Sequence, residues 1–149
     1  MIHDQALDPD ELLVHAAECG VDALAITDHD TLAAFDRVDT SVARTRLVPG
    51  IEFSTAWRGY SVHIVGLDVD PACAALQRGV ERQQRSRDER ARLIARRLRS
   101  KGLPEVLGPV LEIASGKPVG RPHFATHLVR AGIAKDTRTA FRKYLGPGK

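Results

Sequence analysis

The sequence predicts an α/β protein whose second half is mostly helical. Over the first 71 residues, short apolar runs typical of buried strands alternate with amphipathic patterns, in the order helix, strand, helix, strand, strand. From residue 72 the apolar positions thin to a helical stripe. With 149 residues and 43% apolar side chains, the chain can form a core and is too apolar for a disordered protein.

The first helix is predicted to begin at Asp8 and to stop at Gly20. Asp8 is a favourable N-cap, Pro9 suits the first helical position, and acidic side chains follow in the first turn. Glycine is the usual residue just beyond a helix end. The apolar run 22–26 then predicts a buried strand, and the polar segment 27–30 lies at its carboxyl end.

A second helix is predicted over residues 31–43, and a second strand region over residues 47–54. We expect this strand to be interrupted or kinked at positions 49–50, because proline has no N–H to donate to a sheet. Residues 57–60 have the pattern of a hairpin turn, and residues 61–69 that of a third strand.

The second half begins with a long polar helix, predicted over about residues 72–101. Its residues 83–90 include no apolar side chain, so we expect that stretch to face solvent or a ligand. Shorter helices are predicted near 105–114, 122–131 and 136–145. The apolar stripe of the long helix consists of Leu76, Val80, Ala91, Ile94, Ala95 and Leu98.

Charge is distributed unevenly along the chain, whose net charge is +3. Residues 1–77 hold 13 acidic and 4 basic side chains, residues 78–101 hold 3 and 10, and residues 102–149 hold 3 and 8. This asymmetry fits a cation-dependent enzyme with an anionic substrate. The simpler alternative is that the basic run is a solvated helix face.

Several protein classes are excluded by the sequence. No run of about 18 uncharged apolar residues could form a transmembrane helix, and residues 1–4 do not begin a signal peptide. Cys19 and Cys73 lie far apart and form no paired motif, which suits reduced thiols better than a disulfide or a zinc site. We therefore expect a cytoplasmic protein with no membrane partner.

Three residues at or within predicted strands could carry chemistry: His29, Glu52 and His63. A buried carboxylate or imidazole needs a partner, and converging strands provide one place for the three to meet. Imidazoles with a carboxylate suit Mn²⁺, Fe²⁺ or Zn²⁺, and a pair of such ions can clamp a phosphoryl group. The alternative is that each is a satisfied core group or a surface residue.

Four segments in this order resemble the PHP (polymerase and histidinol phosphatase) superfamily of metal-dependent phosphoesterases. They are residues 25–31 (Ala-Ile-Thr-Asp-His-Asp-Thr), 48–54 (Val-Pro-Gly-Ile-Glu-Phe-Ser), 63–67 (His-Ile-Val-Gly-Leu) and 120–124 (Gly-Arg-Pro-His-Phe), the last followed by Tyr-Leu-Gly at 144–146. The likeness is greatest to the branch that hydrolyses 3′,5′-bisphosphate nucleotides and trims RNA from its 5′ end.

The resemblance implies that His29, Glu52 and His63 are metal ligands, with Glu52 bridging two ions. Asp4 falls in register with the Asp of a Ser-Asp-Gly segment that binds a third metal in the family, whereas His3 is a poor candidate. The implied cofactor is a divalent metal, expected to be Mn²⁺, with two or three ions in a complete family member.

The resemblance also implies that Arg121 and His123 contact a nucleotide or an RNA 5′ end. A guanidinium can grip a phosphate at two oxygens, and an imidazole can donate to a third. The alternative is that Arg121-Pro122 only starts a helix, with Arg121 in water.

Other polar residues near these segments have weaker assignments. Asp28 and Asp30 could orient His29, although capping of the next helix explains Asp30 equally well. His15 and His127 have the pattern of helix-surface or packing residues, and we assign them no role.

Some segments that the family's fold contains have no match in this sequence. The opening His-x-His strand, a later Ala-His-Pro histidine and a final Asp-x-His pair are missing. We therefore expect a chain truncated at both ends, forming part of a distorted (β/α)7 PHP barrel with a mostly helical insertion. Residues 1–71 would be the N-terminal part of the barrel and residues 72–149 the insertion, with the C-terminal part of the barrel absent.

The leading functional hypothesis is a PHP-type phosphoesterase acting on nucleotides or RNA 5′ ends, whose activity in so short a chain is open. One alternative is a non-catalytic remnant that binds nucleic acid or nucleotides electrostatically through residues 78–101. A histidinol-phosphate-type phosphatase is weaker, because the segment at 120–123 points to the nucleotide branch. A truncated reading frame with no function of its own is the remaining possibility.

Overall fold

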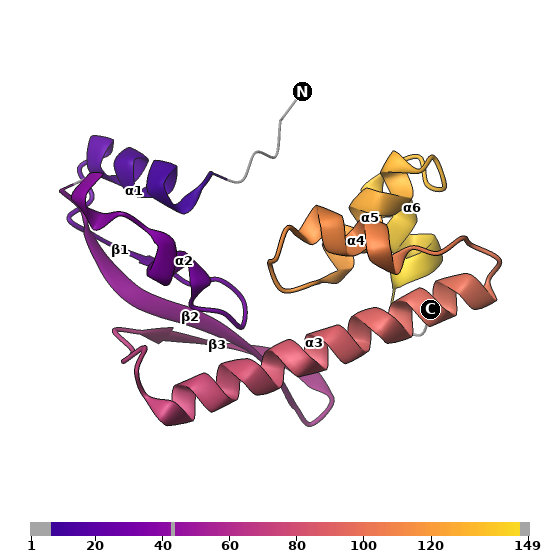
Figure 1. Ribbon diagram of the computed structural model, residues 1–149, viewed down its shortest axis with the longest axis horizontal. Coiled ribbons are helices and arrows are strands. Elements are labelled where there is room, and N and C mark those ends of the chain that lie inside the picture. Colours follow the sequence, from indigo (N-terminus) through magenta and orange to yellow (C-terminus); the bar gives the residue numbers. More distant parts are fainter. Residues whose placement is uncertain (1–6, 43, 147–149) are drawn as a thin grey trace. The chain divides into compact units, whose positions relative to one another are not determined.

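The structure, a computed structural model of the chain, describes residues 7–42 and 44–146. The chain divides into two compact units, Met1–Gln83 (unit 1) and Gln84–Lys149 (unit 2). In the described residues, unit 1 holds a sheet and unit 2 holds only helices (Figure 1). The mixed α/β class and the helical second half are therefore confirmed, and the expected division after residue 71 stays a prediction.

Helix α1 (Pro9–Glu18) has the N-terminus that its sequence predicts. The Asp8 carboxylate accepts a hydrogen bond from Asp10 N at 3.2 Å, and the Glu11 carboxylate accepts one from Asp8 N at 3.1 Å. This reciprocal pair satisfies amides that a helix start otherwise leaves without acceptors. Leu13 is completely buried, so one side of the helix packs and the other side remains in solvent.

The sheet of unit 1 has three strands in the order β1-β2-β3. The central strand β2 (Arg46–Trp57) pairs in parallel with β1 (Ala23–Ile26) over its first four residues. From Gly50 onward it pairs antiparallel with β3 (Tyr60–Leu67). The expected interruption at positions 49–50 is wrong, because β2 continues through both residues. The ladder with β1 ends at Pro49 and the ladder with β3 starts at Gly50, so the proline lies where β2 changes partners. The alternative, a kink at this point, stays a prediction.

Gly50 lets the end of β1 approach β2 closely. A Cβ atom at this position would lie 2.8 Å from the Thr27 side chain and 3.2 Å from the Ile26 carbonyl oxygen. Contacts that short force a neighbour to move, so only glycine fits without a shift. The polar segment after β1 is thereby held against the middle of β2.

The predicted hairpin turn between β2 and β3 is confirmed. Trp57 pairs with Tyr60, and the two residues between them have φ values of 49° (Arg58) and 83° (Gly59). Two successive left-handed residues form the tight turn whose twist matches that of the flanking strands.

The helix predicted over residues 31–43 is shorter in the structure. Helix α2 (Ala33–Arg37) ends at Val38, which is extended, and a single 3₁₀ turn follows at Thr40–Val42. The Asp39 carboxylate accepts hydrogen bonds from both the amide and the hydroxyl of Ser41. Such local side-chain bonds offer the backbone an alternative to the helix, which explains the early end.

Helix α3 (Ala74–Ser100) confirms the long polar helix and crosses the division between the units. Within unit 2, Ala91 and Leu98 of its apolar stripe are buried. Most of the side chains at 83–90 are exposed, as expected for a stretch without apolar residues.

Unit 2 packs around Phe124, which lies on α5 (Arg121–Arg130) and is completely buried. Leu98 of α3 and Val110 of α4 (Leu107–Ala114) are at most 1% exposed and belong to the same cluster. Unit 2 therefore has a core of its own, which fixes the start of α5 and the residues beside it.

The prediction of one helix over residues 136–145 is wrong in detail. One α-helical turn, α6 (Thr137–Ala140), is followed by a π-helical turn, η2 (Phe141–Leu145). Ala140 and Leu145 are both buried in the core, although they are five residues apart. The wider π spacing brings such a pair toward the same side, which an α-helix would not do.

The architecture confirms the α/β class but no barrel. In the residues that the structure describes, the sheet has three strands, so a distorted (β/α)7 barrel remains a prediction. None of the described helices combines the length and the apolar composition that crossing a bilayer requires.

Candidate metal centre and anion-binding residues

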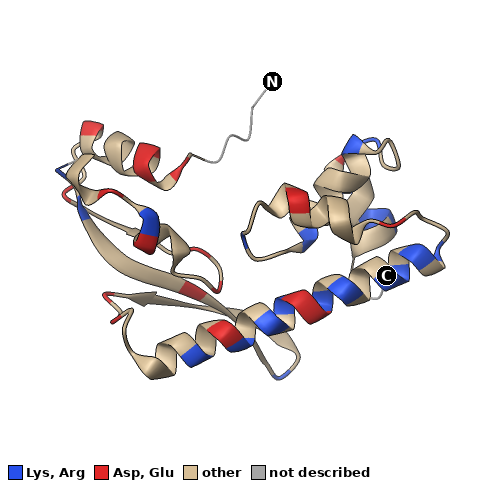
Figure 2. Cartoon of the chain, viewed as in Figure 1, with Lys and Arg blue, Asp and Glu red and all other residues tan. Residues whose placement is uncertain are grey.

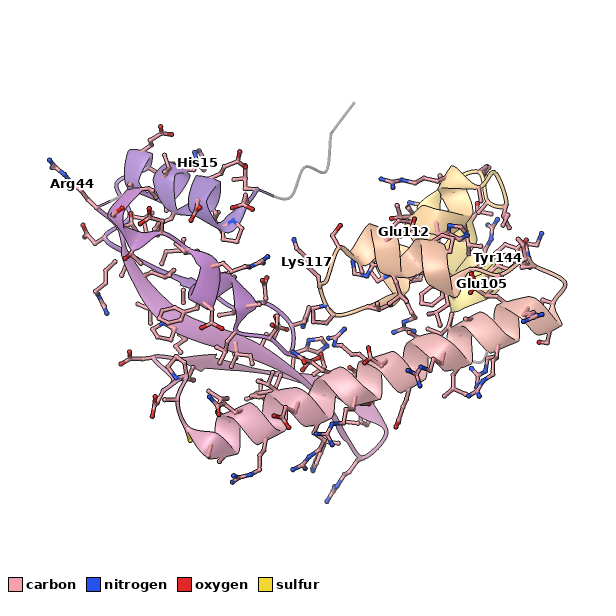
Figure 3. All side chains as sticks on the ribbon, viewed as in Figure 1. His15, Arg44, Glu105, Glu112, Lys117 and Tyr144 are labelled. Carbon is pink, nitrogen blue, oxygen red and sulfur yellow. The ribbon has the colours of Figure 1, made fainter. Side chains whose placement is uncertain are left out.

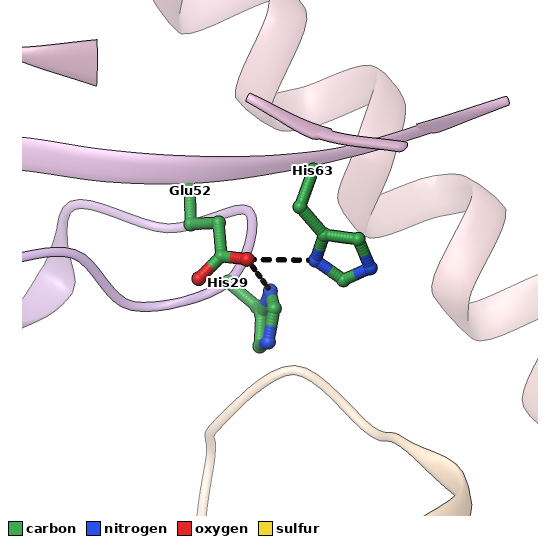
Figure 4. A group of neighbouring side chains, drawn as sticks. All are labelled: His29, Glu52 and His63. Carbon is green, nitrogen blue, oxygen red and sulfur yellow. Dashed lines mark hydrogen bonds and ion pairs between the residues drawn. The ribbon is translucent and has the colours of Figure 1, made fainter. Parts of the chain in front are cut away.

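Three of the predicted metal ligands come together in unit 1. His29 lies in the loop after β1, Glu52 in the middle of β2 and His63 on β3, and Figure 4 shows their side chains converging. His63 Nδ1 lies 2.7 Å from Glu52 Oε1, and His29 Nδ1 lies 3.7 Å from the same oxygen. The two imidazole rings meet edge to face, with centroids 5.0 Å apart.

The strand register explains why Glu52 and His63 meet. Glu52 is directly opposite Val65, and opposite residues of an antiparallel pair share one face of the sheet. His63 is two residues from Val65, so it lies on that same face and diagonally beside Glu52. A shift of the register by one residue would move His63 to the other face.

Backbone hydrogen bonds bring His29 to the same place. His29 forms an isolated parallel bridge with Glu52, beyond the end of β1. Glu52 N donates to the Asp28 carbonyl at 3.1 Å, and Asp30 N donates to the Glu52 carbonyl at 3.0 Å. These bonds on either side of His29 fix its backbone beside the carboxylate.

The Asp30 side chain adds a third bond between the loop and β2. Asp30 is completely buried, has a φ of 58°, and accepts a hydrogen bond from Ser54 N at 2.8 Å. The structure gives helix α2 the N-cap Leu32, without a side-chain cap bond, so capping does not account for Asp30. The contacts of Asp30 favour the other role considered for it, in which Asp30 positions His29.

The donor set fits a divalent cation. One ligand atom from each of His29, Glu52 and His63 lies within 4.8 Å of the others. Two ligands bound at about 2.1 Å to one ion are at most about 4.2 Å apart, so small side-chain rotations would close the group. The side chains are 50%, 25% and 43% exposed respectively, which leaves the group open to an anionic ligand from solvent.

His63 also has a contact on its far side that can orient it. Its Nε2 lies 3.5 Å from the hydroxyl of Ser61, while Nδ1 faces Glu52. A polar partner on the second ring nitrogen is the usual way in which proteins hold a metal-binding imidazole in one orientation.

The remaining candidate residues from the sequence either lie away from this group or fall outside the residues that the structure describes. Asp4, the fourth predicted ligand, and His3 fall outside the described residues. His15 is on the surface of α1, with Nδ1 3.7 Å from a Glu18 oxygen. His127 lies on α5, and its Nε2 is buried without a hydrogen-bond partner among the described residues.

Sequence reasoning missed Ser54, whose amide binds Asp30. The signal was present but weak: an aspartate directly after His29 and a serine two residues after Glu52. A short-range pattern cannot reveal a bond that joins residues 24 positions apart. The pairing of the two segments had to be known first.

Arg121 and His123 lie in unit 2, at the start of α5. Arg121 is exposed, and His123 is half-buried. Gly120 N donates to His123 Nδ1 at 3.0 Å, which requires that nitrogen to be unprotonated and leaves the proton on Nε2. The neutral ring can therefore donate one hydrogen bond from Nε2.

Cationic neighbours and burial act on His123. Burial lowers the pKa of His123 below its usual 6.5, and the charges of Lys117 and Arg87 lower this pKa further. Lys117 lies on the connection between α4 and α5 (Figure 3). A Cβ atom placed on Gly120 would be 3.8 Å from Arg87 Nη1, so this arginine is beside the start of α5.

The chain aligns with known proteins over nearly its whole length. No family model matches. The chain is 41% identical to 5′-3′ exoribonuclease Rnm of Salmonella typhimurium and 39% identical to that of Escherichia coli. It is 41% identical to a 3′,5′-nucleoside bisphosphate phosphatase of Chromobacterium violaceum. These alignments cover 98% of this chain and 51–52% of the relatives, so it spans about half of their length.

Solved structures share the fold. An amidohydrolase from Chromobacterium violaceum, with bound sulfate and no metal, superposes with a TM-score of 0.83 at 39% identity. A protein from Bifidobacterium adolescentis described as a metal-dependent phosphoesterase superposes with a TM-score of 0.82 at 28% identity. The matches cover 97% and 98% of this chain and 52% of each of the other two.

Replacing Asp30 tests whether its carboxylate braces the candidate metal centre. We expect Asp30→Ala to lower the free energy of unfolding by about 1–3 kcal/mol, because Ser54 N loses its buried acceptor. Asp30→Asn keeps an acceptor oxygen and tolerates a positive φ, so it should lose much less. Urea unfolding measures both.

Asp68→Ala is the matched control for Asp30→Ala. Asp68 also has a positive φ, 52°, but is exposed at the end of β3. It therefore reports the cost of a left-handed alanine alone. Equal losses for Asp30→Ala and Asp68→Ala would contradict the bracing role.

Titration of His123 tests its environment. We expect its pKa to lie below 6.5, and Lys117→Gln to move this pKa upward because one repelling charge is removed. NMR of the ring protons measures both values. Since the unfolded chain then binds the proton more tightly, this group destabilises the fold as pH falls from about 6.5 through the lowered pKa. A pKa at or above 6.5 would contradict the described surroundings.

Proposed function

We propose that the chain is a PHP-type, metal-dependent phosphoesterase that hydrolyses phosphate esters of 3′,5′-bisphosphate nucleotides or of the 5′ ends of short RNA. The observation that carries this proposal is the convergence of His29, Glu52 and His63 on one face of the sheet. Their donor atoms suit a divalent transition metal. The names of the relatives, an exoribonuclease and a bisphosphate phosphatase, support the substrate class.

The finer assignments belong to the same proposal. Glu52 would bridge two ions, Asp4 would bind a third, and Mn²⁺ is the ion we expect. The sheet and α1 would form part of a distorted (β/α)7 barrel, as the resemblance of residues 25–31, 48–54 and 63–67 to the PHP superfamily implies. The cytoplasm is the compartment we propose, because Cys19 and Cys73 are both free.

In this proposal, one group of residues binds the metal ion and another binds the phosphate of the substrate. His29, Glu52 and His63 would hold the ion, which supplies Lewis acidity and acidifies a water molecule when bound. Arg121 would grip the phosphate with its guanidinium, and His123 would donate from Nε2. Because His123 is held neutral, it adds a directed hydrogen bond without requiring a proton from solvent.

Phosphate release from 3′-phosphoadenosine 5′-phosphate tests the proposal. We expect the full chain, stripped of metal by a chelator, to be inactive and to regain activity with Mn²⁺. Glu52→Ala and His63→Ala should lower the rate by about 100-fold or more, because even outer contacts of a metal site are worth 10- to 100-fold.

His15→Ala is the control, because His15 lies on the surface of α1 and should leave the rate unchanged. Activity that survives removal of the metal, or no activity from a folded, Mn²⁺-saturated chain, would refute the proposed function. Retained RNA binding in that second case would instead favour a non-catalytic binding module.

A further inference from the structure

The two units carry opposite charge. Unit 2, residues 84–149, has 16 Lys and Arg against 5 Asp and Glu, a net charge of +11. Unit 1, residues 1–83, has 14 acidic and 6 basic side chains, a net charge of −8. Figure 2 marks a run of basic residues along α3, with a few acidic residues among them. A module this basic is typical of proteins that bind a polyanion.

The basic charge is densest in the C-terminal half of α3. Residues 90–101 hold six basic side chains and no acidic one. Arg92, Arg96 and Arg99 are four and three residues apart, a spacing that places them on one helix face, and all three are exposed. We call these three residues the arginine face.

The arginine face is separate from the side of α3 that packs. Ala91 and Leu98, which are seven residues apart, are 3% and 1% exposed and join the core of unit 2. They lie on another side of the helix, so burial of the apolar stripe does not require the arginines.

Helix stability does not account for the arginine face either. Cations in the last turn of a helix are favourable, which explains Arg97 and Arg99. That effect fades beyond the last turn and so does not extend to Arg92 and Arg96. Asp88 lies four residues before Arg92, a favourable spacing, but the charged residues three and four positions from Arg96 are Arg92 and Arg99, which repel it and cost the free chain stability. A bound polyanion would remove that cost.

We propose that the arginine face binds the phosphodiester backbone of an RNA strand whose 5′ end is the substrate. This inference rests on the proposed function. Guanidinium groups bind phosphate oxygens in pairs, and Arg92 and Arg99 are about 10 Å apart along the helix axis, at 1.5 Å per residue. The face holds no aromatic side chain on which bases could stack, so binding is independent of base sequence. A mononucleotide lacks this backbone and gains nothing from the face.

The test compares two triple variants with the same loss of charge. One carries Arg92→Gln, Arg96→Gln and Arg99→Gln on the arginine face. The control carries three Arg→Gln changes at exposed positions of α5, α6 and η2, namely Arg130, Arg138 and Arg142. Fluorescence anisotropy measures binding of each full chain to a 5′-phosphorylated RNA of about 12 nucleotides, over a range of salt concentrations and in chelator to prevent hydrolysis.

We expect the face variant to bind RNA at least about tenfold more weakly than the control. Relative to the unchanged chain, the plot of log K against log salt concentration should become less steep by about 2, because each lost phosphate contact on a single strand contributes about 0.7 to the steepness. Equal losses in the two variants, or no loss in either, would overturn the inference.

Phosphate release from 3′-phosphoadenosine 5′-phosphate separates this inference from the proposed function. Both triple variants should release phosphate at the rate of the unchanged chain. If the unchanged chain releases none but the face variant still loses RNA binding, the proposed function fails and the binding surface stands. If phosphate release is normal and the face variant binds RNA as tightly as the control variant does, the inference alone fails.

Discussion

A short parallel bridge between the loop after β1 and the middle of β2 is the constraint on which the candidate metal centre depends. Without it, His29 would lie in an ordinary loop, and only Glu52 and His63 would share a position fixed by the sheet. Two backbone bonds and the buried Asp30 carboxylate hold the loop in place. The closeness of His29 to Glu52 is therefore built into the backbone rather than left to side-chain rotation.

Local signals in the sequence predict much of the fold. Asp8 and Pro9 locate the start of α1, and the turn residues of the hairpin locate the junction of β2 and β3. The predicted length of α2 is wrong because the Asp39 carboxylate accepts hydrogen bonds from Ser41, which compete with the helix and end it early. The interruption expected at Pro49 does not occur, and local sequence could not show this because the effect of the proline depends on which strands pair beside it.

The sequence predicts which residues form the candidate metal centre, but it does not predict the contacts that hold them in place. His29, Glu52 and His63 stand out in the sequence as polar groups at the end of, or within, apolar strands. The register of β2 and β3 and the bridge at His29 bring them together. Asp30 and Ser54 form a contact between distant segments, which no local pattern contains. The lowered pKa of His123 likewise depends first on burial and then on the charges of Lys117 and Arg87, which only the packing of unit 2 brings about.

The central claim is that His29, Glu52 and His63 together hold a divalent cation. Diffraction from crystals of the chain grown with Mn²⁺, recorded at the manganese absorption edge, tests it most directly. We expect an anomalous peak about 2.2 Å from a Glu52 oxygen and from one nitrogen of each imidazole. Manganese bound only at other residues, with these three side chains turned apart, would contradict the account.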